Sequence, residues 1–231
     1  GRAGHRHRSG AHPMTHRPYT PPAWQSKPLA DGRVTLLVVP LKVQPDERRI
    51  SDSCEIEPGV WAWRNGHDGS LEGRVNLPYA PGDLIWCREA WRNTEDFGLM
   101  YKSCSGVDFN WRSPITMPKW AARTWLRCTG VEVRRVQTIS EDEAWAVGCP
   151  KGDPTDNGGW FPKEELQPDG SEMGWDCPED WVADKWDEQY ALKPRKRAGG
   201  TLPPKPAVDL SFDANPWAAF TTVEKISKED V

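Results

Sequence analysis

The apolar residues of the first third of the chain gather in one continuous run. Residues 32–43, GRVTLLVVPLKV, follow an Asp-Gly turn signal and are rich in Val and Leu. A β-branched apolar run bounded by turn residues predicts a strand buried on both faces, and Pro40 should interrupt it. A second run, LIWCR at residues 84–88, comes directly after a Pro-Gly-Asp turn signal. It predicts a second strand, with Glu89 at its end.

Further along the chain, smaller uncharged residues alternate with arginine and tryptophan. The first set comprises Thr124, Leu126 and Cys128, and the second set comprises Arg123, Trp125 and Arg127. This alternation predicts a strand whose first set faces the core and whose second set faces outward. Thr129 and Gly130 then predict a turn, after which the valines at positions 131, 133 and 136 predict an antiparallel partner strand.

Two later segments carry helix signals. Ser140 is followed by three acidic residues, and Glu143 stands at the spacing of a capping box, so a short helix should begin there and end near Gly148. A second helix should begin at Pro178, since an apolar stripe follows at helical spacing: Trp181, Val182, Trp186 and Tyr190. Residues 215–226, NPWAAFTTVEKI, predict a closing strand.

The polar and Gly/Pro-rich segments suggest one domain with insertions. We expect residues 1–23 to be a disordered leader or tag remnant, residues 24–226 to form the domain, and residues 227–231 to be frayed. Insertions are expected at about residues 46–79, 150–175 and 193–210. The first contains WAWR, which could form one arm of a hairpin, and the last contains a basic run that is either a solvated loop or a nucleic-acid arm.

Composition narrows the function classes. The chain has 231 residues, 28% of them charged, with a net charge of -4. The acidic balance argues against strong nonspecific binding to a phosphate backbone, because that mode needs many uncompensated cations, so nucleic-acid contacts should be local. The 14 tryptophans outnumber the 4 tyrosines and 5 phenylalanines together. Indole rings must therefore carry much of the core, and some are candidates for stacking.

Membranes, metals and cofactors are not predicted. No stretch approaches the roughly 18 consecutive apolar residues of a membrane span, and no apolar region follows the basic start as in a signal peptide, so we expect a cytoplasmic protein. The six cysteines are scattered, without a CxxC pair or a histidine at metal-ligand spacing. They are interpreted as reduced thiols.

Five segments occur in an order that resembles the ASCH-domain (PUA-like) proteins of bacteriophages and prophages. They are DGRVT at 31–35, PGDLIWCREAW at 81–91, WRSPITMPKWAART at 111–124, VEVRRVQTISEDEAWAVG at 131–148 and DANPWAAF at 213–220. The resemblance implies a mainly β (α+β) fold: a small PUA-like β-barrel with two or more flanking helices and long loop insertions. It also implies a cleft beside the first helix-to-strand turn, a bacterial cytoplasm infected by phage as the location, and a nucleotide, modified base or nucleic acid as the partner.

Some small bacterial proteins of this type hydrolyse acetylated cytidine, and this chain departs from their pattern. In GxKxxExR, where Thr may replace Glu, Gly32 is retained, but Val34, Leu37 and Val39 stand where the lysine, the Thr or Glu and the arginine are expected. Val147 stands where the resemblance places a helix glutamate. Aliphatic side chains transfer no protons, so this hydrolysis is not expected here. The remaining catalytic candidates are Glu89 and Thr35, although Thr35 also suits a plain strand residue and Glu89 a structural salt bridge with an adjacent arginine.

The binding candidates combine flat rings with cations, a mixture that can stack a base and contact phosphate. They are Trp111, Arg112, Lys119, Trp120 and Arg123, joined by Arg88 and Arg92 after the second strand. The alternative is that both tryptophans belong to the core and that the cations are solvated.

Three functions remain open. The first is a noncatalytic protein that recognises a nucleotide, modified base or nucleic-acid feature in a cleft. The second is a nucleobase- or nucleoside-modifying enzyme, similar to an amide hydrolase, with a relocated active site at Glu89 or at the acidic start of the short helix. The third is an inhibitor of a host protein, for which the acidic charge and surplus tryptophans are suitable.

Overall fold

The computed structural model describes residues 14–45, 50–106, 109–150, 175, 177–192, 195–197, 200–202 and 208–231. Its central sheet has five strands in the order β1 (His16–Tyr19), β6 (Leu84–Cys87), β9 (Trp125–Arg135), β12 (Trp217–Ile226) and β2 (Leu36–Pro40). β1 and β6 are parallel, and the other neighbours are antiparallel. The first, second and closing strands expected from the apolar runs are therefore confirmed.

The remaining strands of the described part of the chain form three smaller sheets. One contains β3 (Ile50–Glu57), β4 (Val60–Asn65) and β5 (Leu71–Asn76), and the other two are the hairpins β7 (Trp91–Thr94) with β8 (Gly98–Tyr101) and β10 (Arg195–Arg197) with β11 (Gly200–Leu202). The fold is mainly β with few helices, as expected, and the described strands are not closed into a barrel. The WAWR segment lies in β4, the middle strand of its sheet.

Within the described ranges, three helices complete the frame: α1 (Ala23–Ala30), α2 (Glu141–Ala146) and α3 (Pro178–Tyr190). Single 3-10 turns occupy Lys102–Cys104, Pro114–Thr116, Lys119–Ala121, Val136–Thr138 and Lys228–Asp230. Ser140 and Glu143 form the predicted capping box of α2, and Gly148, with φ 110°, follows its end. The predicted start of α3 at Pro178 is confirmed as well.

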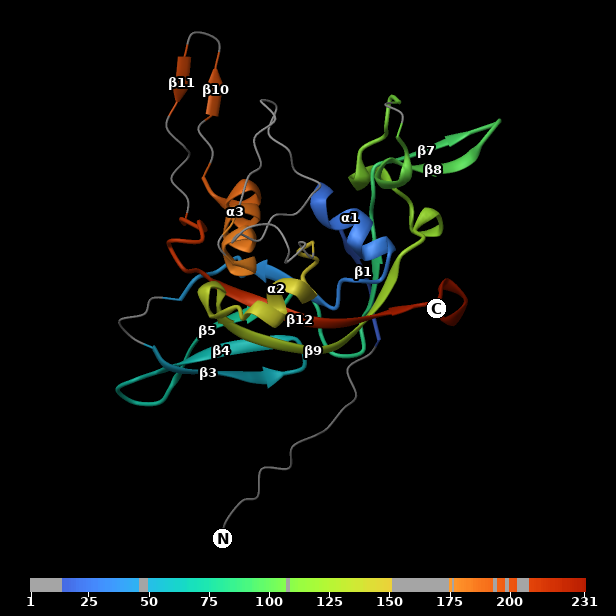
Figure 1. Ribbon diagram of the computed structural model, residues 1–231. Coiled ribbons are helices and arrows are strands. Elements are labelled where there is room, and N and C mark those ends of the chain that lie inside the picture. The colour runs from blue at the N-terminus through green and yellow to red at the C-terminus, as the bar shows by residue number, and fades with distance from the viewer. Residues whose placement is uncertain are drawn as a thin grey trace.

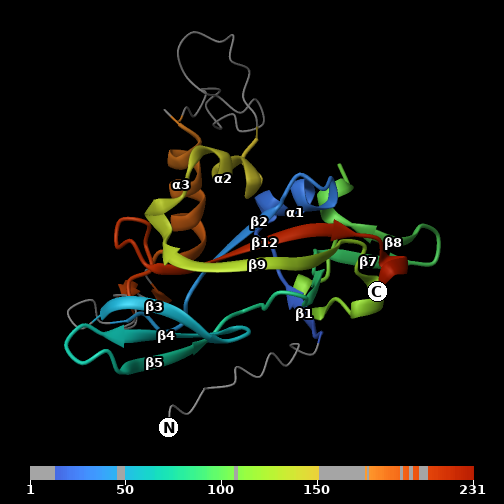
Figure 2. The same cartoon turned by 90° about the horizontal axis from the view of Figure 1, so that it is seen from below.

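The helices and the β3–β4–β5 sheet lie on opposite sides of the central sheet (Figures 1 and 2). The alternation of side chains along β12 explains this arrangement. Ala218 and Phe220 pack with α2 and α3, whereas Ala219 packs with Trp63 and Val75 of the smaller sheet. Because consecutive strand residues point to opposite faces, β12 contributes to the core on both sides.

The predicted turn at Thr129 and Gly130 is wrong. β9 runs through both residues and pairs along its whole length with β12. The register shifts there, since Thr222 pairs with Gly130 and Val223 with Cys128, which leaves Thr129 as the extra residue of a β-bulge. A long partner strand thus overrides a weak local turn signal. Val136, expected in a strand, lies in a 3-10 turn.

Trp125 was predicted to face outward, and this is also wrong. Thr124, Leu126 and Cys128 are buried as expected, but Trp125 is buried on the other side of the strand. His16 of β1 meets its ring edge-on at 6.0 Å, and the Lys119 ammonium lies 5.3 Å from its centre. A segment distant in sequence therefore covers a face that the pattern assigned to solvent.

The structure corrects two predictions within the described residues: the disordered leader at residues 1–23 and the frayed tail at residues 227–231. Residues 16–19 form a strand of the central sheet and Tyr19 is buried, so the leader cannot extend to residue 23. The C-terminal segment forms a 3-10 turn, and the Lys228 ammonium donates a hydrogen bond to the Trp120 carbonyl at 2.6 Å. Residues 1–13, most of the predicted insertion at 150–175 and parts of the one at 193–210 lie outside the described residues.

Candidate functional site

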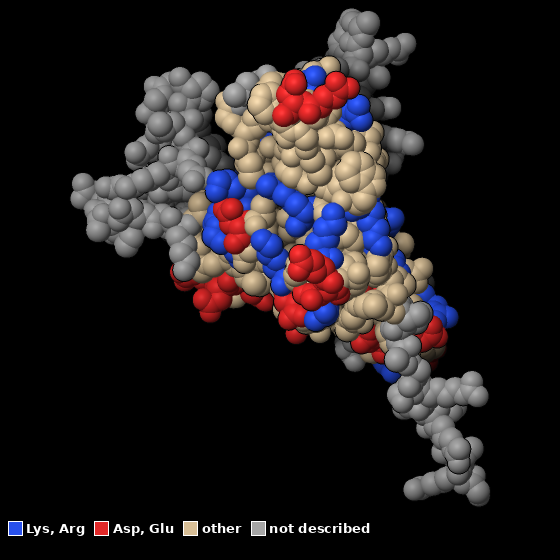
Figure 3. All heavy atoms as spheres, turned by 90° about the vertical axis from the view of Figure 1, so that its right-hand side faces the viewer, with Lys and Arg blue, Asp and Glu red and all other residues tan. Residues whose placement is uncertain are grey.

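Most of the predicted binding residues belong to the β7–β8 hairpin or contact it: Arg92, Arg112, Trp120 and Arg123. The hairpin lies on the opposite side of α1 from α3 (Figure 1). Cations lie over rings here: Arg112 is 5.2 Å from the centre of the Trp91 ring, and Arg92 is 5.9 Å from that of Phe109. Figure 3 shows Lys and Arg side chains gathered in a band across this side of the molecule, with Asp and Glu above and below. The surface thus combines rings and positive charge.

The two tryptophans of this surface differ in exposure. Trp120 is 60% exposed and meets the buried Trp91 edge-on at 6.4 Å. Trp111 is half-buried against Phe109, and its indole N–H is buried without a hydrogen-bond partner among the described residues. The alternative that both belong to the core is therefore wrong for Trp120, whose ring is presented to solvent.

Glu89 and Arg123 are brought together, but as a structural pair. Glu89 is only 2% exposed, and its two carboxylate oxygens accept hydrogen bonds from Arg123 Nε at 3.0 Å and Nη2 at 2.8 Å. Ser103 Oγ donates a third at 2.5 Å. The salt-bridge alternative for Glu89 is confirmed, except that its partner is Arg123 and not an adjacent arginine. Arg88 lies instead 5.6 Å from the centre of the Trp86 ring.

Thr35 lies apart from these residues. It is exposed in a hollow that also has Arg33, Asp142 and Trp145 in its wall, and its backbone N–H donates to the Ala146 carbonyl at 2.9 Å. Its backbone carbonyl accepts from Val223 N–H at 2.9 Å. The backbone of Thr35 thus connects α2 to β12, and Thr35 lies one residue before β2, so its interpretation as a strand residue is not confirmed.

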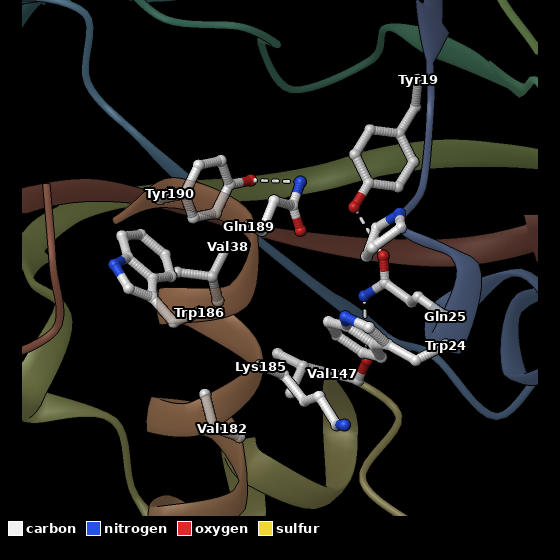
Figure 4. Close-up of a pocket in the computed structure, with 11 residues that line it drawn as sticks. Tyr19, Trp24, Gln25, Val38, Val147, Val182, Lys185, Trp186, Gln189 and Tyr190 are labelled. Atoms are coloured by element: carbon white, nitrogen blue, oxygen red, sulfur yellow. Dashed lines mark hydrogen bonds between the residues drawn. The ribbon is translucent and has the colours of Figure 1, made fainter. Parts of the chain in front are cut away.

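A separate cleft lies between α1 and α3 (Figure 4). Two helices, two strands and two connecting segments supply its wall: Tyr19, Pro22, Trp24, Gln25, Val38, Val147, Val182, Lys185, Trp186, Gln189 and Tyr190. The helix-to-strand turn that follows α1 at Asp31 and Gly32 holds α1 beside β2, because Gly32, with φ +78°, accepts a left-handed conformation that other residues resist. None of the residues of this turn lines the cleft, which lies beside the start of α1, so the cleft that the resemblance implies beside the turn stays a prediction.

Aromatic rings of the cleft are held in place by neighbours. The Trp24 ring meets Trp181 edge-on, with centres 5.1 Å apart, and the Trp186 ring lies 4.6 Å from that of Tyr190. Trp186 Nε1 donates to the Leu210 carbonyl at 2.7 Å. Rings fixed in this way lose little conformational freedom when a ligand packs against them.

Gln25 supplies a buried amide at the base of the cleft. Its side-chain oxygen accepts a hydrogen bond from the Tyr19 hydroxyl at 2.5 Å, and its Nε2 donates to the Val147 carbonyl at 2.9 Å. Gln25 is 2% exposed. An amide can make four hydrogen bonds, so one N–H and one oxygen lone pair of Gln25 have no side-chain or backbone partner in the described part of the chain.

Burial fixes the protonation of the phenols in the cleft. Burial raises the pKa of Tyr190 to about 12 and raises that of Tyr19 well above its usual value, with a smaller contribution from the nearby Tyr190. Both phenols therefore stay protonated at neutral pH, and Tyr19 acts as a hydrogen-bond donor to Gln25.

The cleft continues outward into a second hollow of about 510 Å³, with which it shares Pro22, Trp24, Lys185 and Gln189. The inner cleft itself encloses only about 30 Å³, roughly the volume of one water molecule. Lys185 lies at the boundary, with its ammonium 3.7 Å from Glu188 and 5.8 Å from the centre of the Trp175 ring. Long side chains thus separate the small interior from the wide entrance.

The aliphatic replacements fall in different places. Val147 lines the cleft, whereas Val34 and Leu37 are buried in the core. Val39 packs against the core cluster that contains Leu37, on the side of β2 that faces away from the cleft. Sequence reasoning missed the cleft residues Trp24, Gln25, Lys185 and Gln189, and it assigned Trp186 and Tyr190 only to an apolar stripe. Trp24 and Gln25 lie at the start of α1, one helix length before the Asp-Gly turn, so no local signal in the sequence assigned them to a cleft.

No group of His, Cys, Asp or Glu suited to a metal ion occurs within the described ranges. Among the helices that the structure describes, none has the length and hydropathy of a membrane span. Comparisons with protein-family models, curated proteins and solved structures found no match.

Proposed function

We propose that this protein binds a nucleotide or modified base, with the base packed against Trp24 at the entrance of the α1–α3 cleft, and that it does so without the amide hydrolysis of ASCH-type enzymes. The observation that carries this proposal is the pairing of a fixed ring, Trp24, with the buried amide of Gln25 in one cleft. A flat ring and an amide are the two elements that recognise a base, by its face and by its edge.

The sizes of the two hollows define how a base would enter. The entrance of about 510 Å³ accommodates a nucleoside, whereas the inner cleft must first open. Lys185 and Gln189 carry long unbranched side chains and lie at the boundary, so their movement is the least costly way to expose the Gln25 amide. Stacking on one ring contributes about 1 to 3 kcal/mol, which gives selectivity with modest affinity.

The chemistry of the wall supports binding over proton transfer. Among the described residues that line the inner cleft, none is a carboxylate, a histidine or a thiol, and the two phenols stay protonated. The entrance adds one carboxylate, Glu188, which lies 3.7 Å from the Lys185 ammonium. Val147 occupies the place where the resemblance puts a glutamate. Glu89, the alternative base, is already held by Arg123 and Ser103 outside this cleft.

We further propose that the fold is related to the PUA-like proteins and that the base belongs either to a free nucleotide or to a strand of nucleic acid. The exposed Trp120 ring and the cations Arg112 and Lys119 offer further contacts for such a strand beyond α1. These contacts are local, in keeping with the net charge of -4.

The test is a panel of nucleosides, including cytidine and acetylated cytidine, together with mononucleotides and short DNA and RNA strands. Thermal shift and tryptophan fluorescence report binding, and chromatography of the ligand reports turnover. We expect saturable quenching without turnover. Trp24→Leu should weaken binding about 5- to 150-fold, the equivalent of one stacking contact, and Trp24→Phe should retain most of it.

For nucleosides, Trp120→Leu is the matched control, because it also removes one indole ring but lies outside the cleft and is proposed to contact only a longer strand. Equal losses in Trp24→Leu and Trp120→Leu would contradict a site in the cleft. Turnover of acetylated cytidine would favour the enzyme instead, and absence of any response to the whole panel would leave the inhibitor of a host protein as the better hypothesis.

A further inference from the structure

A second groove lies between the central sheet and the β3–β4–β5 sheet. Its wall comes from β1, from the end of β2 and the residues after it, and from β5 and the residues after it: Arg17, Pro18, Val39, Pro40, Leu41, Lys42, Val43, Arg74, Val75, Asn76, Leu77, Pro78 and Tyr79. Val38 lines the α1–α3 cleft and its neighbour Val39 lines this groove. Because consecutive strand residues point to opposite faces, the two sites lie on opposite sides of β2.

Three cations from three separate segments line the groove. Arg17 belongs to β1, Lys42 follows β2 and Arg74 belongs to β5, and all three are exposed. No carboxylate occurs among the residues of the wall, all of which the structure describes. Positive charge on three sides of one hollow, with no acidic residue in the lining, favours an anion.

Each cation keeps donors for a ligand. Lys42 has no hydrogen bond or ion pair within the described residues, so its ammonium is available. Arg74 pairs with Glu57 at 3.3 Å, but both side chains are more than 60% exposed, so water competes with this pair and a ligand can displace it.

Arg17 is positioned by its Nε alone. That atom lies 3.1 Å from a carboxylate oxygen of Asp83 and donates to Thr15 Oγ1 at 3.1 Å. Asp83 is buried and also accepts hydrogen bonds from Thr15 and Ala80, so donors within the fold already compensate its carboxylate charge. The terminal nitrogens of Arg17 make no hydrogen bond or ion pair within the described residues. They can therefore donate the bidentate hydrogen bonds to phosphate oxygens for which a guanidinium is suited.

We propose that this groove binds the phosphate groups of a small phosphorylated molecule through Arg17, Lys42 and Arg74, with the Asn76 amide as a neutral donor. Its volume of about 560 Å³ lies within the range of small-molecule sites, about 300 to 1,000 Å³. A small ligand fits better than a long strand, because the chain as a whole is acidic and repels a polymer of phosphates. The site is independent of the nucleotide cleft.

The probe is inorganic pyrophosphate, titrated into the full chain by calorimetry at low ionic strength and again with added NaCl. We expect saturable binding that weakens with salt, since charge supplies most of the attraction. The double variant Lys42→Gln and Arg74→Gln should lower the affinity about 10-fold or more. The control is Lys27→Gln with Lys102→Gln, which removes the same charge from exposed lysines outside the groove and should change the affinity less than about 2-fold.

Circular dichroism checks that all variants fold. Absence of saturable binding by the unchanged protein, or equal losses in the two double variants, would overturn the proposal. A short oligothymidylate that requires Lys42 and Arg74 while pyrophosphate does not bind would also overturn it, because the occupant would then be a nucleic-acid strand. Trp24→Leu separates the two sites: unchanged pyrophosphate binding supports a distinct groove, and lost binding would move the anion into the cleft and refute the assignment.

Discussion

Replacing Arg123 by leucine tests whether Glu89 is a structural residue. The change removes the hydrogen bonds from Nε and Nη2 and leaves a carboxylate that is 2% exposed with Ser103 as its remaining side-chain donor. Charge-assisted hydrogen bonds contribute about 1.5 to 3 kcal/mol each, and breaking a buried ion pair costs about 3 to 5 kcal/mol. Since the Arg123 side chain is 27% exposed and water can enter its place, we expect a loss of about 3 kcal/mol.

Urea denaturation of a double-mutant cycle measures this coupling. Glu89→Gln removes the charge while keeping the shape, and it should cost about 1 to 2 kcal/mol. Combined with Arg123→Leu, it should cost less than the sum, because the stranded carboxylate is gone. Arg127→Leu is the matched control: Arg127 lies four residues further on and pairs with Glu224 at 2.9 Å, but both side chains are exposed, so the loss should stay below about 1 kcal/mol.

Two outcomes would refute this reasoning. Losses for Glu89→Gln and Arg123→Leu that add within about 0.5 kcal/mol would show that the pair is not coupled. A ligand response that disappears in Glu89→Gln while the fold is retained would show that the carboxylate acts on a ligand and would revive the relocated enzyme site.

Three further predictions concern single positions. Burial alone would raise the pKa of Asp83, but hydrogen bonds from Thr15 and Ala80 and the charge of Arg17 hold it below its usual value. Asp83 therefore stabilises the fold above about pH 4, and it stabilises the fold less as the pH falls through its folded pKa. In urea unfolding, Asp83→Asn should lower the free energy of unfolding most near neutral pH and less in acid. A loss of unfolding free energy that does not depend on pH would contradict this. Ser140→Ala should lower the free energy of unfolding by about 1 kcal/mol, because the capping box of α2 is lost; Ser113→Ala, which removes a serine that caps no helix through its side chain, is the control. Trp120→Leu should change stability by less than about 0.5 kcal/mol, yet remove a fluorescence component that is accessible to acrylamide, since the ring is 60% exposed. A large loss of stability would show that the ring is part of the core.

Signals that act over a few residues determined much of the frame. The Asp-Gly turn before β2, the capping box at Ser140 and the proline at the start of α3 all have local physical causes. Gly32 adopts a φ value above zero, the Ser140 side chain accepts a hydrogen bond from a nearby backbone N–H, and Pro178 has no N–H. Each of these features constrains the backbone at its own position. The sequence alone therefore predicted where α2 and α3 begin, and it placed a turn ahead of β2, whose first residue is Leu36.

The tertiary structure decided the features that require two distant segments. β1 is a strand because β6 offers it a parallel edge, Trp125 is buried because His16 covers it, and Thr129 is a bulge because β12 continues past it. The candidate cleft has the same origin: Trp24 and Gln25 become a site only when α3 packs beside α1. Contacts between residues more than a hundred positions apart, such as that of Gln25 with the Val147 carbonyl, leave no periodic trace in either segment, so no pattern along the chain contains them.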